Sequence, residues 1–163
     1  SITMKKDCRF YANLGLAYFY SRKVEQAKRA YLSAISLNPS YNVAKINLAV
    51  LLIRKMRFRK GIKYLNEVIA SEHDNFYAHL FLGYAYFRLR EYTLARKHLT
   101  TGIKYNSNYF ELYYYRAHVY YKLKNYGYAL RDLNIALRIE PNHRRARLLQ
   151  SLIRRQGRRG YGF

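Results

Sequence analysis

The feature that most constrains the fold of this chain is an internal repeat with a period of 34 residues. Aligning the sequence with itself at that offset gives four copies without insertion or deletion, and a fifth, partial copy begins at Arg144. The four full copies begin at Cys8, Asn42, Phe76 and Phe110. A period of this size is typical of stacked supersecondary units, because one such unit cannot bury its apolar face without its neighbours.

Small residues recur in three phases of the repeat. The three sets are Gly15, Ala49, Gly83 and Ala117; Ala27, Gly61, Ala95 and Ala129; and Ala34, Val68, Gly102 and Ala136. Eleven of these twelve positions hold Gly or Ala, where composition alone would give about two. A small residue lets a second helix approach closely, so the pattern predicts a pair of packed helices in each copy.

Large apolar residues recur beside the small ones. The sets are Tyr18, Leu52, Tyr86 and Tyr120; Tyr31, Leu65, Leu99 and Leu133; and Leu14, Leu48 and Leu82, with Arg116 as the exception. Within a copy the spacing is helical, as in Leu82, Ala85 and Tyr86 at i, i+3 and i+4. The copies therefore read as helix–turn–helix units.

These residues resemble the tetratricopeptide repeat (TPR) family. The first copy carries the motif as NLGLAYFYSRKVEQAKRAYLSAISLNP, and the fourth ends in YALRDLNIALRIEPN. The middle copies depart from it: Lys45 and His79 stand where an aromatic is expected, and His73 and Ser107 replace the closing proline. The resemblance implies an all-α fold, a right-handed superhelical α-solenoid of helix–turn–helix repeats.

The repeat phase predicts where each segment lies. A lead-in (1–7) precedes four repeats that span 8–141, with approximate limits 8–41, 42–75, 76–109 and 110–143; a capping helix (142–156) and a basic, flexible tail (157–163) follow. First helices are expected at about 8–21, 42–55, 76–89 and 110–123, and second helices at about 24–37, 58–71, 92–105 and 126–139.

The run YFELYYYRAHVYY (Tyr109–Tyr121) could by composition be a strand, a stacking platform for bases or a helix core. The repeat phase assigns it to the first helix of the fourth copy. Tyr113 and Tyr120 are then expected to pack the helical pair, whereas Tyr114 and Tyr115 face outward with the last tyrosine of the run.

The resemblance implies an interaction scaffold in which the first helices line a concave groove for a peptide or a partner helix. The residues predicted to line it are mostly aromatic: Phe19, Tyr20, Ile53, Arg54, Tyr77, Phe81, Tyr84, Phe87, Arg88, Tyr114, Tyr115, His118, Tyr121 and Lys122. Tyrosine suits such a surface because it joins a large apolar body to a polar hydroxyl, although some of these rings are expected only to pack on one another. The carboxylate clamp that binds chaperone tails in this family is not predicted, because only Asn47 matches it.

The net charge of +22, from 31 Lys and Arg against 9 Asp and Glu, predicts a polyanionic partner. The cations expected to bind it are Arg29, Lys63, Lys97 and Arg131 on the convex second helices, Arg57, Arg59 and Lys60 at a turn, and Arg144, Arg145, Arg154 and Arg155 near the end. A run of charge is usually a solvated face, but such a face is normally mixed in sign. Two hypotheses remain: basic edges dock on an acidic protein, or the chain is an RNA-associated subunit of a ribonucleoprotein such as a (mitochondrial) ribosome.

Catalysis, a metal, a cofactor and a small-molecule substrate are not predicted. The five histidines lack metal-ligand spacing, and no phosphate loop or nucleophile motif is present. Cys8 is the single cysteine, which fits a reducing compartment. No apolar run is long enough for a transmembrane segment and no signal peptide is recognised, so we expect an intracellular protein, cytoplasmic or organellar (mitochondrial).

Overall fold

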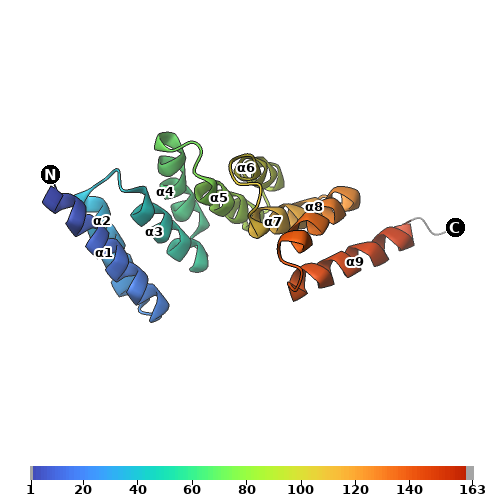
Figure 1. Cartoon of the computed structure of the whole chain (residues 1–163), viewed down its shortest axis with the longest axis horizontal. Helices are drawn as coiled ribbons and strands as arrows, with labels where there is room; N and C mark the ends of the chain where they lie inside the picture. Colours follow the sequence, from blue (N-terminus) through green and yellow to red (C-terminus); the bar gives the residue numbers. More distant parts are fainter. Residues whose placement is uncertain (1, 161–163) are drawn as a thin grey trace. The chain divides into compact units, whose positions relative to one another are not determined.

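The computed structural model describes the backbone of residues 2–160 and the side chains of residues 7–156 (Figure 1). Within that part every regular element is an α-helix, as the repeat predicts. The helices are α1 (Ile2–Tyr20), α2 (Val24–Leu37), α3 (Asn42–Arg54), α4 (Phe58–Ser71), α5 (Phe76–Arg88), α6 (Tyr92–Tyr105), α7 (Phe110–Lys122), α8 (Tyr126–Ile139) and α9 (Arg144–Gly160). The handedness of a superhelix stays a prediction.

The chain divides into two compact units, Ser1–His73 with α1 to α4 and Asp74–Phe163 with α5 to α9. In the first unit α1 packs on α2, α3 packs on α4, and both α1 and α2 contact α3. In the second unit α5 packs on α6, α7 packs on α8, α7 contacts both α5 and α6, and α9 packs on α8. Each unit thus contains two helical pairs, and the second also has the final helix.

The small residues act as the sequence predicts. A β-carbon added at Gly15 would lie 2.5 Å from Cε1 of Tyr31, and one at Gly83 would lie 2.5 Å from Cγ of Leu99. Tyr31 and Leu99 are buried on the second helix of their pairs. The absence of a side chain on the first helix therefore makes the close approach possible.

The turn inside each pair has the same backbone conformation in all four copies. Its central residue has a positive φ of 59° to 62° at Arg22, Met56, Arg90 and Lys124. In the first copy the amide of Arg22 donates to the carbonyl of Phe19 and that of Lys23 donates to Tyr18, and the other copies repeat both bonds. This is the Schellman motif that ends a helix, formed here without glycine.

Three predicted boundaries differ from the structure. Residues 2–7, expected to lead into the first helix, belong to α1, and residues 157–160, expected in the tail, continue α9. The last three residues of the predicted tail, 161–163, lie outside the described residues. Each first helix also ends one residue earlier than expected, because Leu89 and Leu123, for example, are C-cap residues.

Candidate partner-binding surface

The second unit brings five of the predicted groove residues together on α5 and α7, which lie side by side. We call this set the aromatic surface: Tyr84, Phe87, Tyr114, Tyr115 and His118, all half-buried. The rings of Tyr84 and Tyr115 have centroids 4.9 Å apart, and those of Phe87 and His118 are 5.9 Å apart. The ring of Tyr114 lies 4.7 Å from His118 and 5.5 Å from Tyr115, so the five rings form one continuous layer.

Cationic side chains border the aromatic surface. Nη1 of Arg88 donates a hydrogen bond of 2.8 Å to the hydroxyl of Tyr84, and its guanidinium lies 5.7 Å from the centre of that ring. Nζ of Lys122 lies 5.8 Å from the centre of Tyr121. The charge of Arg145 acts on Tyr114 and Tyr115, since it opposes the rise in their pKa that burial causes.

Tyr115 and His118 of this surface are uncharged near neutral pH. Burial, with smaller contributions from nearby acidic groups, raises the pKa of Tyr115 to about 12. Burial, helped by the charge of Lys122, lowers the pKa of His118 to about 4. The surface therefore offers neutral hydroxyl and imidazole groups that can donate or accept hydrogen bonds, set among apolar ring faces.

One residue that the sequence did not single out, His143, extends this surface by packing against Tyr114 and the buried Phe110. The ring of His143 lies 4.3 Å from Phe110 and 5.2 Å from Tyr114, and Phe110 stacks 5.3 Å from Tyr114. Nδ1 of His143 also accepts a hydrogen bond from the amide of Ala146, which caps α9.

The other predicted groove residues of this unit lie in separate groupings. Tyr77 packs against Phe76 and Tyr109, with centroid distances of 4.1 and 5.5 Å. Tyr121 contacts Tyr126 at 6.1 Å, and Phe81 is half-buried on α5.

In the first unit the structure brings three predicted residues together and removes a fourth. Cζ of Arg54 lies 4.8 Å above the ring of Phe19, which packs edge to face with the exposed Tyr20 at 5.7 Å. The prediction for Ile53 is wrong: it is 3% exposed, and its side chain packs over Gly61 of α4 in the core. The missing side chain at Gly61 creates the space that Ile53 fills.

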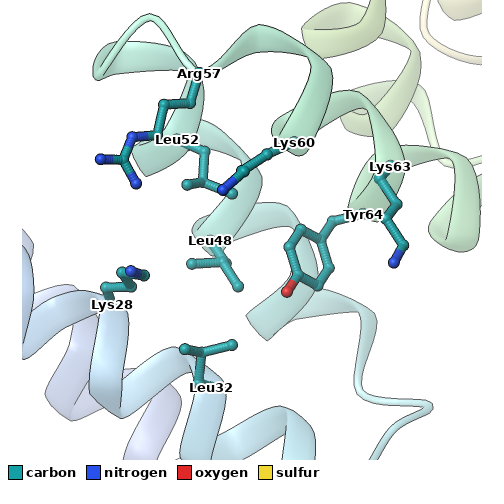
Figure 2. A pocket seen from close by; sticks show the side chains of 8 residues that line it. All are labelled: Lys28, Leu32, Leu48, Leu52, Arg57, Lys60, Lys63 and Tyr64. Atoms are coloured by element: carbon teal, nitrogen blue, oxygen red, sulfur yellow. The ribbon is translucent and has the colours of Figure 1, made fainter.

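The cations predicted to bind a polyanion are all exposed: Arg29, Lys63, Lys97 and Arg131 on the second helices, Arg57, Arg59 and Lys60 around the start of α4, and Arg144, Arg145, Arg154 and Arg155 on α9. In the first unit, Arg57, Lys60 and Lys63 surround a pocket together with Lys28, which the sequence did not indicate (Figure 2). Their role in binding stays a prediction.

The described residues contain no cluster of three or more His, Cys, Asp or Glu side chains suited to hold a metal ion. Among the helices described, none combines the length and the apolar character that crossing a bilayer requires.

Three family models match successive parts of the chain. The tetratricopeptide repeat model matches residues 8–41, a second tetratricopeptide repeat model matches 46–108, and the Fis1 C-terminal tetratricopeptide repeat matches 111–161. None of the curated proteins matches the sequence significantly.

Several solved structures share the fold. PilF of Pseudomonas aeruginosa is 21% identical, with 96% of this chain and 72% of that chain covered and a TM-score of 0.88. The MamA protein is 21% identical, with 91% and 81% covered and a TM-score of 0.80. YrrB, described as a TPR protein with an unusual peptide-binding site, is 18% identical, with 91% and 77% covered and a TM-score of 0.74. At these identities the similarity shows the fold, that of helical-repeat solenoids.

Proposed function

Because the chain belongs to the tetratricopeptide-repeat family, whose fold is a protein-binding scaffold, we propose that it is a non-catalytic subunit that holds a protein partner within a larger assembly. The aromatic surface on α5 and α7 takes a helix or an extended peptide of that partner. Basic residues at its border and on the second helices favour a partner with acidic residues beside its apolar anchors.

The observation that carries the proposal is the half-buried state of five adjacent rings. Helix packing alone would bury aromatic side chains such as Phe110, which is 4% exposed. The rings of Tyr84, Phe87 and His118 instead keep part of their area in water. Rigid aromatic side chains of this kind lose little conformational entropy on binding and are enriched at the energetic centres of protein interfaces.

The cationic border adds a preference for charge. Arg88 is fixed over Tyr84 by its hydrogen bond, so its guanidinium is positioned before a ligand arrives. Planar guanidinium groups bind carboxylates in a bidentate manner. We therefore expect the partner segment to place Asp or Glu beside its apolar residues.

The turns supply a second argument for basic docking. Arg22, Arg90 and Lys124 occupy left-handed conformations, which cost a non-glycine residue about 1 kcal/mol relative to glycine. A cation in three of the four turns, where glycine would be more stable, fits a role in binding rather than in folding.

Selection of peptides from a displayed library against the full chain, followed by titration of the enriched peptides, tests the proposal. Tyr84→Ala and Phe87→Ala should each weaken binding by about tenfold or more, as expected at an interface hot spot. Tyr128→Ala is the matched control, since Tyr128 is an exposed tyrosine on α8 outside the aromatic surface. Equal losses in all three variants would contradict the proposal.

The RNA hypothesis rests on the net charge of +22 and makes a different prediction. An electrostatic RNA complex weakens steeply as salt rises, whereas a peptide anchored mainly by rings weakens less steeply. Titration of a homopolymeric RNA across a salt series, with wild type and with Phe87→Ala, separates the two. Tight RNA binding that is insensitive to Phe87→Ala, without any enriched peptide, would favour the RNA-associated function.

A further inference from the structure

A pocket of about 310 Å³ lies between α2, α3 and α4 of the first unit (Figure 2). Its apolar lining comes from Leu32 on α2, Leu48 and Leu52 on α3, and the ring of Tyr64 on α4. Leu48 and Leu52 are 1% and 5% exposed, so they form a floor that belongs to the core. Four cationic residues complete the lining: Lys28, Arg57, Lys60 and Lys63.

The cationic lining has no acidic counterpart. None of the four basic side chains forms an ion pair with another described residue, and no Asp or Glu lines the pocket. Figure 2 shows the guanidinium of Arg57 and the amine of Lys60 on the same side of the pocket, with Lys28 across from them. The mutual repulsion of these charges is a cost that an anion in the pocket would relieve.

The N-terminal end of α4 adds further positive charge beside the four cations of the pocket. Arg57 is the N-cap of α4 without a side-chain capping bond, and the first turn contains no acidic residue. The N-terminal end of a helix carries partial positive charge and is stabilised by anions. By contrast, the first turn of α2 contains Glu25. The cations on α4 thus add to the partial positive charge of the helix N-terminus, whereas an acidic residue would compensate it.

The equivalent surface of the second unit has a different arrangement of charges. Two repeats along, Arg116 takes the place of Leu48 and Asp132 takes the place of Tyr64. Arg116 binds Asp132 through Nε at 2.7 Å and Nη2 at 2.8 Å, and Tyr120 stacks on Tyr128 at 5.2 Å. A pocket there is lined by Asn125, Tyr126, Gly127, Tyr128 and Arg131, with one cation instead of four, so the cationic lining of the first pocket is not a necessity of the repeat.

We propose that the pocket of the first unit binds one large apolar side chain, such as leucine, that is flanked by acidic residues in a protein partner. The three leucines of the lining fit an aliphatic side chain, and the four cations fit carboxylates on either side of it. RNA is less suited, since base recognition on a surface needs stacking faces and Tyr64 is the one aromatic lining residue. The pocket is therefore a specific place at which an acidic partner is expected to bind. This proposal does not depend on the aromatic surface.

The test is titration of the full chain with two labelled peptides, one with a single leucine between two groups of three acidic residues, the other with alanine in its place. Burial of three further carbon atoms predicts that the leucine peptide binds about tenfold or more tightly than the alanine peptide. Lys28→Gln/Lys63→Gln should weaken the leucine peptide by about tenfold at low salt. Arg96→Gln/Arg131→Gln removes the same charge at the equivalent positions of the second unit and should change the affinity less than twofold.

Any of the following results would overturn the proposal. Equal binding of the two peptides, or equal losses in the two double variants, would show only general attraction between opposite charges. No binding of the leucine peptide at low salt would show that the pocket does not bind such a segment, and binding of a homopolymeric RNA that alone depends on Lys28 and Lys63 would show that it binds nucleic acid instead. Tyr84→Ala separates the two sites: a loss of leucine-peptide affinity in Tyr84→Ala that is absent in Lys28→Gln/Lys63→Gln would place the binding at the aromatic surface and overturn this proposal.

Discussion

Replacing Arg116 with leucine should destabilise the second unit strongly, although leucine occupies this position in the other three repeats. Arg116 forms a bidentate pair with Asp132, whose side chain is 4% exposed. Nη1 of Arg116 also donates to the hydroxyl of Thr100 at 3.1 Å. The substitution leaves a buried carboxylate without its cation, and such a loss costs about 3–5 kcal/mol.

Removing the other partner should cost less. In Asp132→Ala, Arg116 keeps its bond to Thr100 and stays 5.8 and 5.9 Å from the centres of the Tyr113 and Tyr120 rings. Its side chain is 15% exposed, which allows some hydration of the guanidinium. We therefore expect a loss of about 2 kcal/mol, close to that of hydrogen bonds to a charged group.

The double variant Arg116→Leu/Asp132→Ala recreates the pair that the first repeat has at Leu14 and Ala30. It contains no buried charge, and apolar replacement of a buried ion pair is often neutral. Its free energy of unfolding should lie within about 1 kcal/mol of wild type, which gives a coupling energy of about 4 kcal/mol or more.

Urea unfolding followed by far-ultraviolet circular dichroism measures these free energies. Repeat proteins can unfold in parts, so amide hydrogen exchange of α7 and α8 is needed to locate the loss. A loss below 1 kcal/mol in Arg116→Leu, or a double variant equal to the sum of the single ones, would refute the reasoning. Either result would mean that the pair is hydrated and contributes as a surface ion pair does.

Three further predictions concern packing, turns and pH. Gly83→Ala should destabilise by about 1–2 kcal/mol in urea titrations, because the new methyl group meets Leu99; Gly127→Ala, with nothing within 4 Å, should stabilise by about 0.5 kcal/mol. Met56→Gly should raise the free energy of unfolding by about 0.5–1 kcal/mol, because its φ is 59°, and a loss would show that the methionine side chain contributes to packing. His98 and His118 both have a pKa lowered to about 4, so the folded state binds fewer protons and loses stability as the pH falls from 6.5 towards 4. Partial exposure limits this to about 1 kcal/mol per histidine between pH 7 and pH 5, and His118→Phe should flatten the pH dependence measured by thermal unfolding.

Most of the helices could be predicted because the same sequence pattern occurs in four copies. The second helices α2, α4, α6 and α8 begin and end at the predicted residues, since each follows a turn with the same two backbone bonds. The start of α1 was missed because the other copies are preceded by a turn, while the residues before Cys8 contain no helix breaker. Sequence similarity between copies says nothing about a segment that only one copy has.

The candidate sites were harder to predict than the helices. The rings of the aromatic surface lie on the same face of two neighbouring first helices. The spacing of aromatic residues along those helices therefore predicts most of them. Ile53 was assigned wrongly because its phase resembles that of a groove residue, whereas Gly61 opens a space for it in the core. The cationic pocket combines Lys28 from one second helix with Lys60 from the next and a floor from the helix between them. An alignment of repeats compares residues at the same repeat position. It does not show that residues at different repeat positions of neighbouring copies line one pocket.

The side chains at one pair of repeat positions differ among the four copies, and they change the local surface of each copy. The pairs are Leu14 and Ala30, Leu48 and Tyr64, Leu82 and His98, and Arg116 and Asp132. In the second copy the pair lines the cationic pocket, in the third His98 stacks on Tyr86 and on His79, and in the fourth the pair forms an ion pair. The small residues at the helix contacts hold the backbone fixed in every copy, so substitution at these two positions changes the surface without changing the fold. The cationic pocket of the second copy is thus one of four arrangements that the fold tolerates at this pair of positions.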